Sequence, residues 1–141
     1  MTAPALDYGS GGRIGVLLPS VNQAAEPQLR AMLPADIAIA LHAKRSAASV
    51  ASLLGMARDV EPAAELLADA GVDIVVFHCT AVSTYSTELE ASILARIQSA
   101  TGLPCVATSQ ALVAALQALP ARRVVLLSPY TAAWIAAPAA R

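Results

Sequence analysis

The chain has 141 residues and a mass of 14.4 kDa, a length typical of one compact domain. Of its residues, 57% are apolar and only 13% are charged, with a formal net charge of −1. No basic stripe is present to neutralise a run of phosphates, so nucleic acid is not an expected partner. No apolar run reaches the about 18 residues that a membrane helix needs, so we expect no membrane span.

The cysteine content and the N-terminal sequence bear on the compartment. Cys79 and Cys105 are the only cysteines, too few to staple a small secreted scaffold and not spaced as zinc ligands. Residues 1–12 lack the basic start and apolar core of a signal peptide, and we interpret them as a short disordered leader. These features favour a cytoplasmic location with reduced thiols, and they predict neither a metal ion nor a cofactor.

Short apolar runs predict five buried strands. In chain order they are residues 14–18, 37–41, 74–77, 105–107 and 124–127. Most of these runs are continuously apolar rather than alternating, as strands are when both faces of their sheet are covered.

Segments with the apolar spacing of helices separate these runs: residues 24–33, 50–70, 87–100 and 110–119. Gly71 and Gly102 stand where helices would end in a left-handed residue. Thr87 and Glu90 have the spacing of a capping box. Pro62 falls inside the second segment, so we expect the helix to kink there or to restart at Pro62.

Strand and helix alternate along the whole chain, which predicts an α/β fold. We expect a flavodoxin-like, doubly wound and mainly parallel sheet of about four to five strands, with helices on both faces. Such winding places the first and third strands side by side at the centre. One domain would span residues 13–131, followed by an alanine-rich tail at 132–141. Because ligands of such sheets bind beyond the carboxyl ends of the strands, we expect the site in the loops after residues 18 and 77.

Cys79 directly follows the third predicted strand and is the candidate nucleophile. Backbone N–H groups and the dipole at a helix start favour a thiolate, which would lower the pKa of Cys79 and make it more reactive than Cys105. The alternative is a buried structural cysteine. Cys105 begins a strand and is expected in the core. His78 points to the opposite face of an extended strand and is a poor partner for the thiol.

Four other loop residues offer polar groups to an anion. Thr80 and Ser83, with the N–H groups of their loop, could bind a carboxylate or could simply cap the following helix. The amide of Asn22, after the first strand, could bind a carboxylate or its own backbone. Tyr130, at the end of the last predicted strand, could donate its hydroxyl to the crevice or close the edge of the sheet.

Four segments together resemble the aspartate/glutamate racemase superfamily, and most closely its maleate cis-trans isomerase and arylmalonate decarboxylase branch. They are RIGVLLPSVN at 13–22 with EP at 26–27, AGVDIVVFHCT at 70–80, TGLPC at 101–105 and RRVVLLSPYT at 122–131. The resemblance implies that Cys79 is the catalytic thiol of the first half of such an enzyme. It also places Thr80, Asn22 and Tyr130 around a small carboxylate substrate.

The resemblance implies isomerase or racemase chemistry on a small dicarboxylic acid, because decarboxylase members carry glycine where this chain has Cys79. In the isomerase, the thiolate would attack the alkene of maleate, and the adduct would rotate and eliminate as fumarate. A decarboxylase-like enzyme is the first alternative. A non-catalytic half-domain that binds a small carboxylate, or is inert, is the second.

Full-length members of that superfamily are about twice as long and carry a second cysteine in their other half. They also continue differently after the positions of Tyr130 and Thr131, where this chain has an alanine-rich sequence. The resemblance therefore implies a truncated or single-half relative. We expect such a chain to show little or no isomerase activity by itself and to bind dicarboxylates weakly. A homodimer could supply the missing cover of the crevice.

Overall fold

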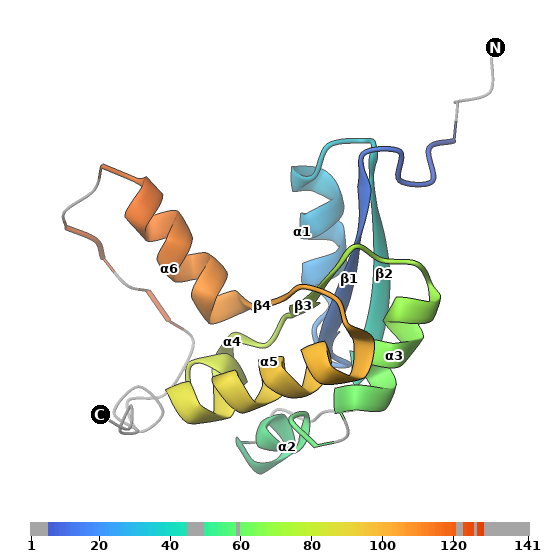
Figure 1. Ribbon diagram of the computed structural model, residues 1–141. Helices are drawn as coiled ribbons and strands as arrows, with labels where there is room; N and C mark the ends of the chain where they lie inside the picture. Colours follow the sequence, from blue (N-terminus) through green and yellow to red (C-terminus); the bar gives the residue numbers. More distant parts are fainter. Residues whose placement is uncertain (1–5, 45–49, 59, 121–122, 126, 129–141) are drawn as a thin grey trace.

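In the part of the chain that the structure describes, four parallel strands form the centre of the fold (Figure 1). The structure, a computed structural model, describes residues 6–44, 50–58, 60–120, 123–125 and 127–128. The strands are β1 (Gly12–Pro19), β2 (Ile37–Lys44), β3 (Ile74–Phe77) and β4 (Cys105–Ala107), in the order β2-β1-β3-β4. Leu17 of β1 pairs with His42 on one side and with Phe77 on the other. The predicted parallel α/β sheet, with the first and third strands adjacent at its centre, is confirmed.

The described residues contain six helices, which connect or follow the strands. They are α1 (Ala25–Met32), α2 (Val50–Gly55), α3 (Val60–Asp69), α4 (Thr80–Ser83), α5 (Thr87–Thr101) and α6 (Thr108–Ala118). Gly71 and Gly102 have φ values of 68° and 69°, so the predicted left-handed residues are confirmed. The short helix α4 was not predicted, because four residues are too few to show a helical period.

Two helix starts differ from the sequence prediction. The segment 50–70 is interrupted as expected, but the new helix begins at Val60, so that Pro62 lies in its first turn, where no N–H is needed. The predicted capping box of Thr87 and Glu90 is wrong. Ser86 is the cap instead, and its Oγ accepts a hydrogen bond from the N–H of Leu89 at 3.0 Å.

The two faces of the sheet are covered unequally. Leu17, Val75 and Phe77 point to the face under α3 and α5 and are completely buried in the larger core. The smaller core, on the face under α1, contains Val16 and Leu18. The difference follows from strand geometry, since successive side chains of β1 point to opposite faces.

The predicted fifth strand is wrong for the residues that the structure describes. Val124, Val125 and Leu127 belong to no strand and are 63%, 89% and 90% exposed. The reason lies in α6, which contains no buried residue and projects away from the sheet beyond β4 (Figure 1). The chain therefore leaves the sheet before residues 124–127 can pair with the free edge of β4.

Two residues of the N-terminal segment before β1, Tyr8 and Gly11, are hydrogen-bonded to other parts of the chain. The N–H of Gly11 donates to the carbonyl of Asp36 at 2.9 Å, and Arg13 donates to the carbonyl of Tyr8 at 2.8 Å. Residues 1–5 and the tail at 132–141 lie outside the described residues. Within the described part of the chain, no helix is long and apolar enough to cross a bilayer.

Candidate functional site

The carboxyl ends of β1, β3 and β4 lie at one edge of the sheet, because neighbouring strands are parallel. The N–H of His78 donates to the carbonyl of Leu17 at 2.7 Å, which extends the pairing of β1 and β3 one residue beyond β3. The loop after β1 and the start of α4 therefore begin side by side. This edge brings together the elements that carry Asn22, Cys79 and Thr80.

Cys79 is the N-cap residue of α4 and is only 4% exposed. It belongs to the larger core. Burial raises the pKa of the Cys79 thiol, whereas hydrogen bonds from the N–H groups of Val82 and Ala81 act to lower it. The expected net lowering of this pKa is therefore wrong, because the sequence indicated the helix start but not the depth of burial. The exposure ranking expected for the two thiols is reversed as well, since Cys105 is only partly buried.

The carbonyl of Thr80 and the hydroxyl of Ser83 form hydrogen bonds within the single turn of α4. The Ser83 side chain is 2% exposed, and its Oγ donates to the carbonyl of Thr80 at 3.4 Å. The same carbonyl accepts the Thr84 N–H at 2.9 Å. Ser83 therefore satisfies its hydroxyl inside α4, while Thr80 is half-buried at the first position of that helix.

The side-chain oxygen of Asn22 binds backbone N–H groups at the start of α1. Its Oδ1 accepts hydrogen bonds from the N–H groups of Ala24 at 3.1 Å and Ala25 at 3.0 Å. The amide is thus oriented by the backbone that it binds, and the NH₂ end is the part that is suited to contact an anion. Tyr130, the fourth expected substrate contact, lies outside the described residues.

Thr108 is a residue at this edge that the sequence analysis missed. Its Oγ1 donates to the carbonyl of Phe77 at 3.2 Å and lies 3.4 Å from Nδ1 of His78. Burial lowers the pKa of His78, which favours the neutral imidazole. Thr108 directly follows β4, so the rule that pointed to the loops after the first and third strands could also have found it.

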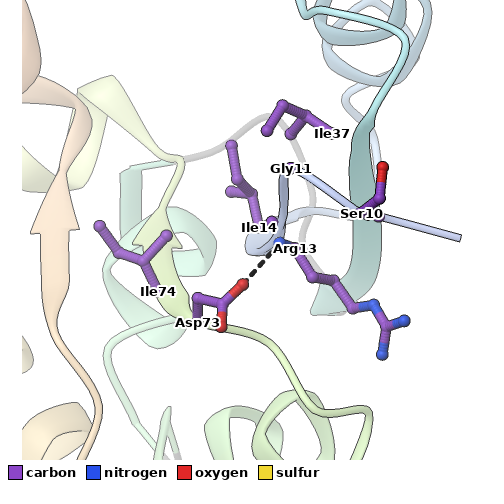
Figure 2. A pocket seen from close by; sticks show the side chains of 9 residues that line it. Ser10, Gly11, Arg13, Ile14, Ile37, Asp73 and Ile74 are labelled. Atoms are coloured by element: carbon purple, nitrogen blue, oxygen red, sulfur yellow. Dashed lines mark hydrogen bonds between the residues drawn. The ribbon is translucent and has the colours of Figure 1, made fainter.

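Two cavities among the described residues are lined by residues other than Asn22, Cys79 and Thr80. Figure 2 shows one of about 580 Å³ at the opposite edge, where the amino ends of β1, β2 and β3 meet. Its polar groups serve the fold: the N–H of Arg13 donates to Oδ2 of Asp73 at 2.7 Å, and the Arg13 guanidinium binds the carbonyl of Ala70 at 2.7 Å. A second cavity of about 510 Å³ lies between α5 and α6. Among the described residues, no cluster of His, Cys, Asp and Glu has the arrangement of a metal site.

Comparison with known proteins gives a consistent assignment. The family model described as arylmalonate decarboxylase matches residues 14–137. A liganded mutant of arylmalonate decarboxylase, with one glycine changed to cysteine and one cysteine to serine, is 27% identical with a TM-score of 0.65, over 79% of this chain and 48% of that one. No curated protein matches the sequence.

Two maleate isomerases share the fold at lower identity. The enzyme from Pseudomonas putida is 23% identical with a TM-score of 0.62, over 75% of this chain and 48% of that one. A mutant of the Nocardia farcinica maleate cis-trans isomerase with a covalently bound succinylcysteine intermediate is 21% identical, with the same TM-score of 0.62 and the same coverages of 75% and 48%. The chain thus spans about half the length of the structures that it matches. Since the family model extends over most of the sequence, the chain belongs to the arylmalonate decarboxylase family.

Proposed function

We propose that this chain carries the nucleophile of a cysteine-dependent enzyme that acts on a small dicarboxylic acid, with maleate isomerisation as its reaction type. The observation that carries the proposal is the position of Cys79. It lies at the carboxyl edge of the central strand β3, where burial raises the pKa of its thiol and hydrogen bonds from the N–H groups of Val82 and Ala81 offset part of that rise. The covalent succinylcysteine in the similar Nocardia farcinica isomerase supports the same use of a thiol.

The proposed reaction needs no net oxidation or reduction. The Cys79 thiolate adds to one alkene carbon of maleate, and the π electrons move to the neighbouring carbon, where the adjacent carboxylate stabilises them. A proton taken up at that carbon gives a succinyl thioether and is lost again before elimination. Rotation about the new single bond, return of the electron pair and cleavage of the C–S bond then release fumarate and restore the thiolate.

Two residues of the same edge are proposed to hold the carboxylates. The NH₂ group of Asn22 is the first, because its Oδ1 is already held by the start of α1 and fixes the amide plane. Thr80 is the second, as a half-buried hydroxyl residue next to Cys79. Both are neutral, so each binds an anion through hydrogen bonds without adding charge. We assign Ser83 to the stability of α4, in line with its hydrogen bond to Thr80.

The experiment is to incubate the chain with maleate, follow fumarate by NMR and analyse the protein by mass spectrometry. We expect a maleate adduct on the peptide that contains Cys79, even where turnover is low. Cys105→Ser is the matched control and should keep the adduct, whereas Cys79→Ser should lose it. Absence of both adduct and turnover, or an adduct that survives Cys79→Ser, would contradict the proposal.

Decarboxylation is the second candidate, favoured by the description of the matching family model. The same preparation is tested with an arylmalonate, and release of CO₂ is measured. Loss of CO₂ that is insensitive to Cys79→Ser would favour this candidate over the isomerase reaction. If neither maleate nor the arylmalonate is converted, the alternative of a non-catalytic domain would stand.

A further inference from the structure

Strand β2 forms one edge of the sheet, and its outer side pairs with no strand in the part of the chain that the structure describes. The order β2-β1-β3-β4 places β2 and β4 at the two edges. β4 has only three residues, whereas β2 has eight, with the sequence IAIALHAK and no proline. None of the β2 residues is fully buried, unlike the last five of β1. A long apolar edge strand without proline is a surface on which another strand can pair.

The outer side of β2 presents the main-chain groups of its odd-numbered residues. The carbonyl of Lys44 accepts a hydrogen bond from the N–H of Ser20, which directly follows β1, so Lys44 directs its carbonyl towards β1. Successive residues of a strand direct their N–H and C=O groups to opposite sides. The main-chain groups of Ile39, Leu41 and Ala43 therefore point outward, where an added strand would bind them.

The charges at the two ends of β2 fit a second copy of this chain as the added strand. Asp36 directly precedes β2, and Lys44 is its last residue. Two β2 strands that pair antiparallel about a two-fold axis at Ala40 place Asp36 of each copy opposite Lys44 of the other. Both residues lie on the face where Ala40 packs against the larger core, because each is four positions from it. Opposite charges thus meet twice, whereas parallel pairing in the same register would bring like charges together.

Helix α3 carries an exposed leucine beside the same edge. α3 contacts β1 and β2, whereas α5 contacts β4 (Figure 1). Glu61 binds Arg96 of α5, so the flank of α3 that carries Glu61 faces α5. Leu66 lies on the opposite flank, across the buried stripe that includes Ala63 and Leu67, and is 56% exposed. That flank faces the β2 edge, where α3 of a second copy would cover the leucine.

We propose that this chain forms a homodimer in which two β2 strands pair antiparallel and join the two sheets into one. Ala40 lies on the two-fold axis and faces its own copy. Ile39 of each strand exchanges main-chain hydrogen bonds with Leu41 of the other, and the two ion pairs lie at the ends of the paired strands. The proposal goes beyond the proposed function and does not depend on the chemistry of Cys79.

The first test is the mass of the full chain in solution, measured by sedimentation equilibrium from about 5 to 200 µM, a range that covers weak to moderate dimers. We expect a monomer–dimer equilibrium. Asp36→Lys and Lys44→Asp should each weaken self-association by about tenfold or more, because each places like charges opposite one another at both ends of the paired strands. An equimolar mixture of the two variants should dimerise again, because opposite charges then meet at both ends.

A matched pair of leucine substitutions tests the α3 flank. Leu66→Arg should weaken dimerisation by about tenfold, because it places a charge in the contact between the two α3 helices. Leu112→Arg is the control: Leu112 is 47% exposed on α6, beyond the other edge of the sheet, and this variant should dimerise like the parent. Circular dichroism checks that both variants fold. Loss of the dimer in Leu112→Arg but not in Leu66→Arg would overturn the proposal.

Disulfide formation tests the register of the two strands. Ala40→Cys, in a chain with Cys79→Ser and Cys105→Ser, should form an intermolecular disulfide under mild oxidation, because this position faces its own copy across the axis. Ala38→Cys in the same background should not, because its copy lies four positions further along the paired strand. A parent chain that stays monomeric throughout, or a disulfide through position 38 and not through position 40, would overturn the proposal.

Discussion

Arg96 of α5 binds the carboxylate of Glu61 of α3 through two nitrogens. Its Nε donates to Oε1, and its Nη2 donates to Oε2 at 2.6 Å. The remaining Nη1 donates to the carbonyl of Ala57 at 2.7 Å. The Arg96 side chain therefore links α5 both to α3 and to the turn that precedes α3, over the larger core of the sheet.

This pair predicts a stability that depends on pH. The hydrogen bonds from Arg96 lower the pKa of Glu61 to about 2. A carboxylate with a lowered pKa stabilises the fold above the pKa of the unfolded chain, and the contribution is lost as the pH falls towards 2. Glu61→Gln should therefore lower Tm at pH 7, with a difference from the parent that shrinks below pH 4 and vanishes near pH 2. Glu65→Gln, on the exposed side of α3, is the control and should change Tm little. An equal decrease in Tm at pH 7 and at pH 2 would contradict the ion-pair explanation.

Gly15 of β1 packs closely against Leu67 of α3 and Val72, which leaves little room for a side chain at this position. A Cβ at this position would lie 3.0 Å from Cγ2 of Val72 and 3.2 Å from Cβ of Leu67, and both neighbours are buried. Gly15→Ala should cost about 1–3 kcal/mol of unfolding free energy, because overpacked neighbours in a core cannot move away. Gly55→Ala adds the same group where nothing lies within 4 Å. Urea denaturation should show that this control is neutral or slightly stabilising.

The two thiols are predicted to differ in alkylation. Cys79 is 4% exposed and its pKa is raised by burial, so iodoacetamide should modify it more slowly than the partly buried Cys105. The rate at Cys79 should increase about tenfold per pH unit below its pKa, because the thiolate is the reacting form. A raised thiol pKa also means that the fold loses stability as the pH rises through it. Peptide mapping over a pH series measures both rates. Faster modification of Cys79 at neutral pH would mean that the start of α4 opens readily.

His78 is predicted to stay neutral to a lower pH than an exposed histidine. Burial lowers its pKa, so the folded chain binds fewer protons than the unfolded chain just below neutral pH, and stability should fall as the pH drops through this window. Because the single hydroxyl proton of Thr108 is donated to Phe77, Nδ1 of His78 should carry the imidazole proton and donate to Thr108. Nitrogen NMR of the variant His42→Gln, which leaves one histidine, reads both the pKa and the tautomer. Thr108→Val should remove the preference for the Nδ1–H tautomer.

The positions of most elements could be predicted from the sequence because their signals are local. The apolar runs of β3 and β4 match the predicted strands, and the glycines at 71 and 102 mark two helix ends. Strand ends were less certain: β1 and β2 extend to Gly12–Pro19 and Ile37–Lys44, beyond the apolar runs. Their ends depend on the pairing partner, since Leu18 and Pro19 pair with Ala43 and Lys44. An apolar count cannot detect such pairing.

The sequence by itself determined the order of the four strands and the longer helices, the parallel sheet and the place of Cys79 at the carboxyl end of a central strand, because these follow from local periodicity and from the handedness of strand–helix–strand units. Only the tertiary structure decided how deeply Cys79 is buried, and therefore that its pKa is raised. It also decided that α6 leaves the sheet, so that residues 124–127 form no strand where they are described. Burial and docking depend on contacts between segments that are distant in the chain, and no local pattern in the sequence records them.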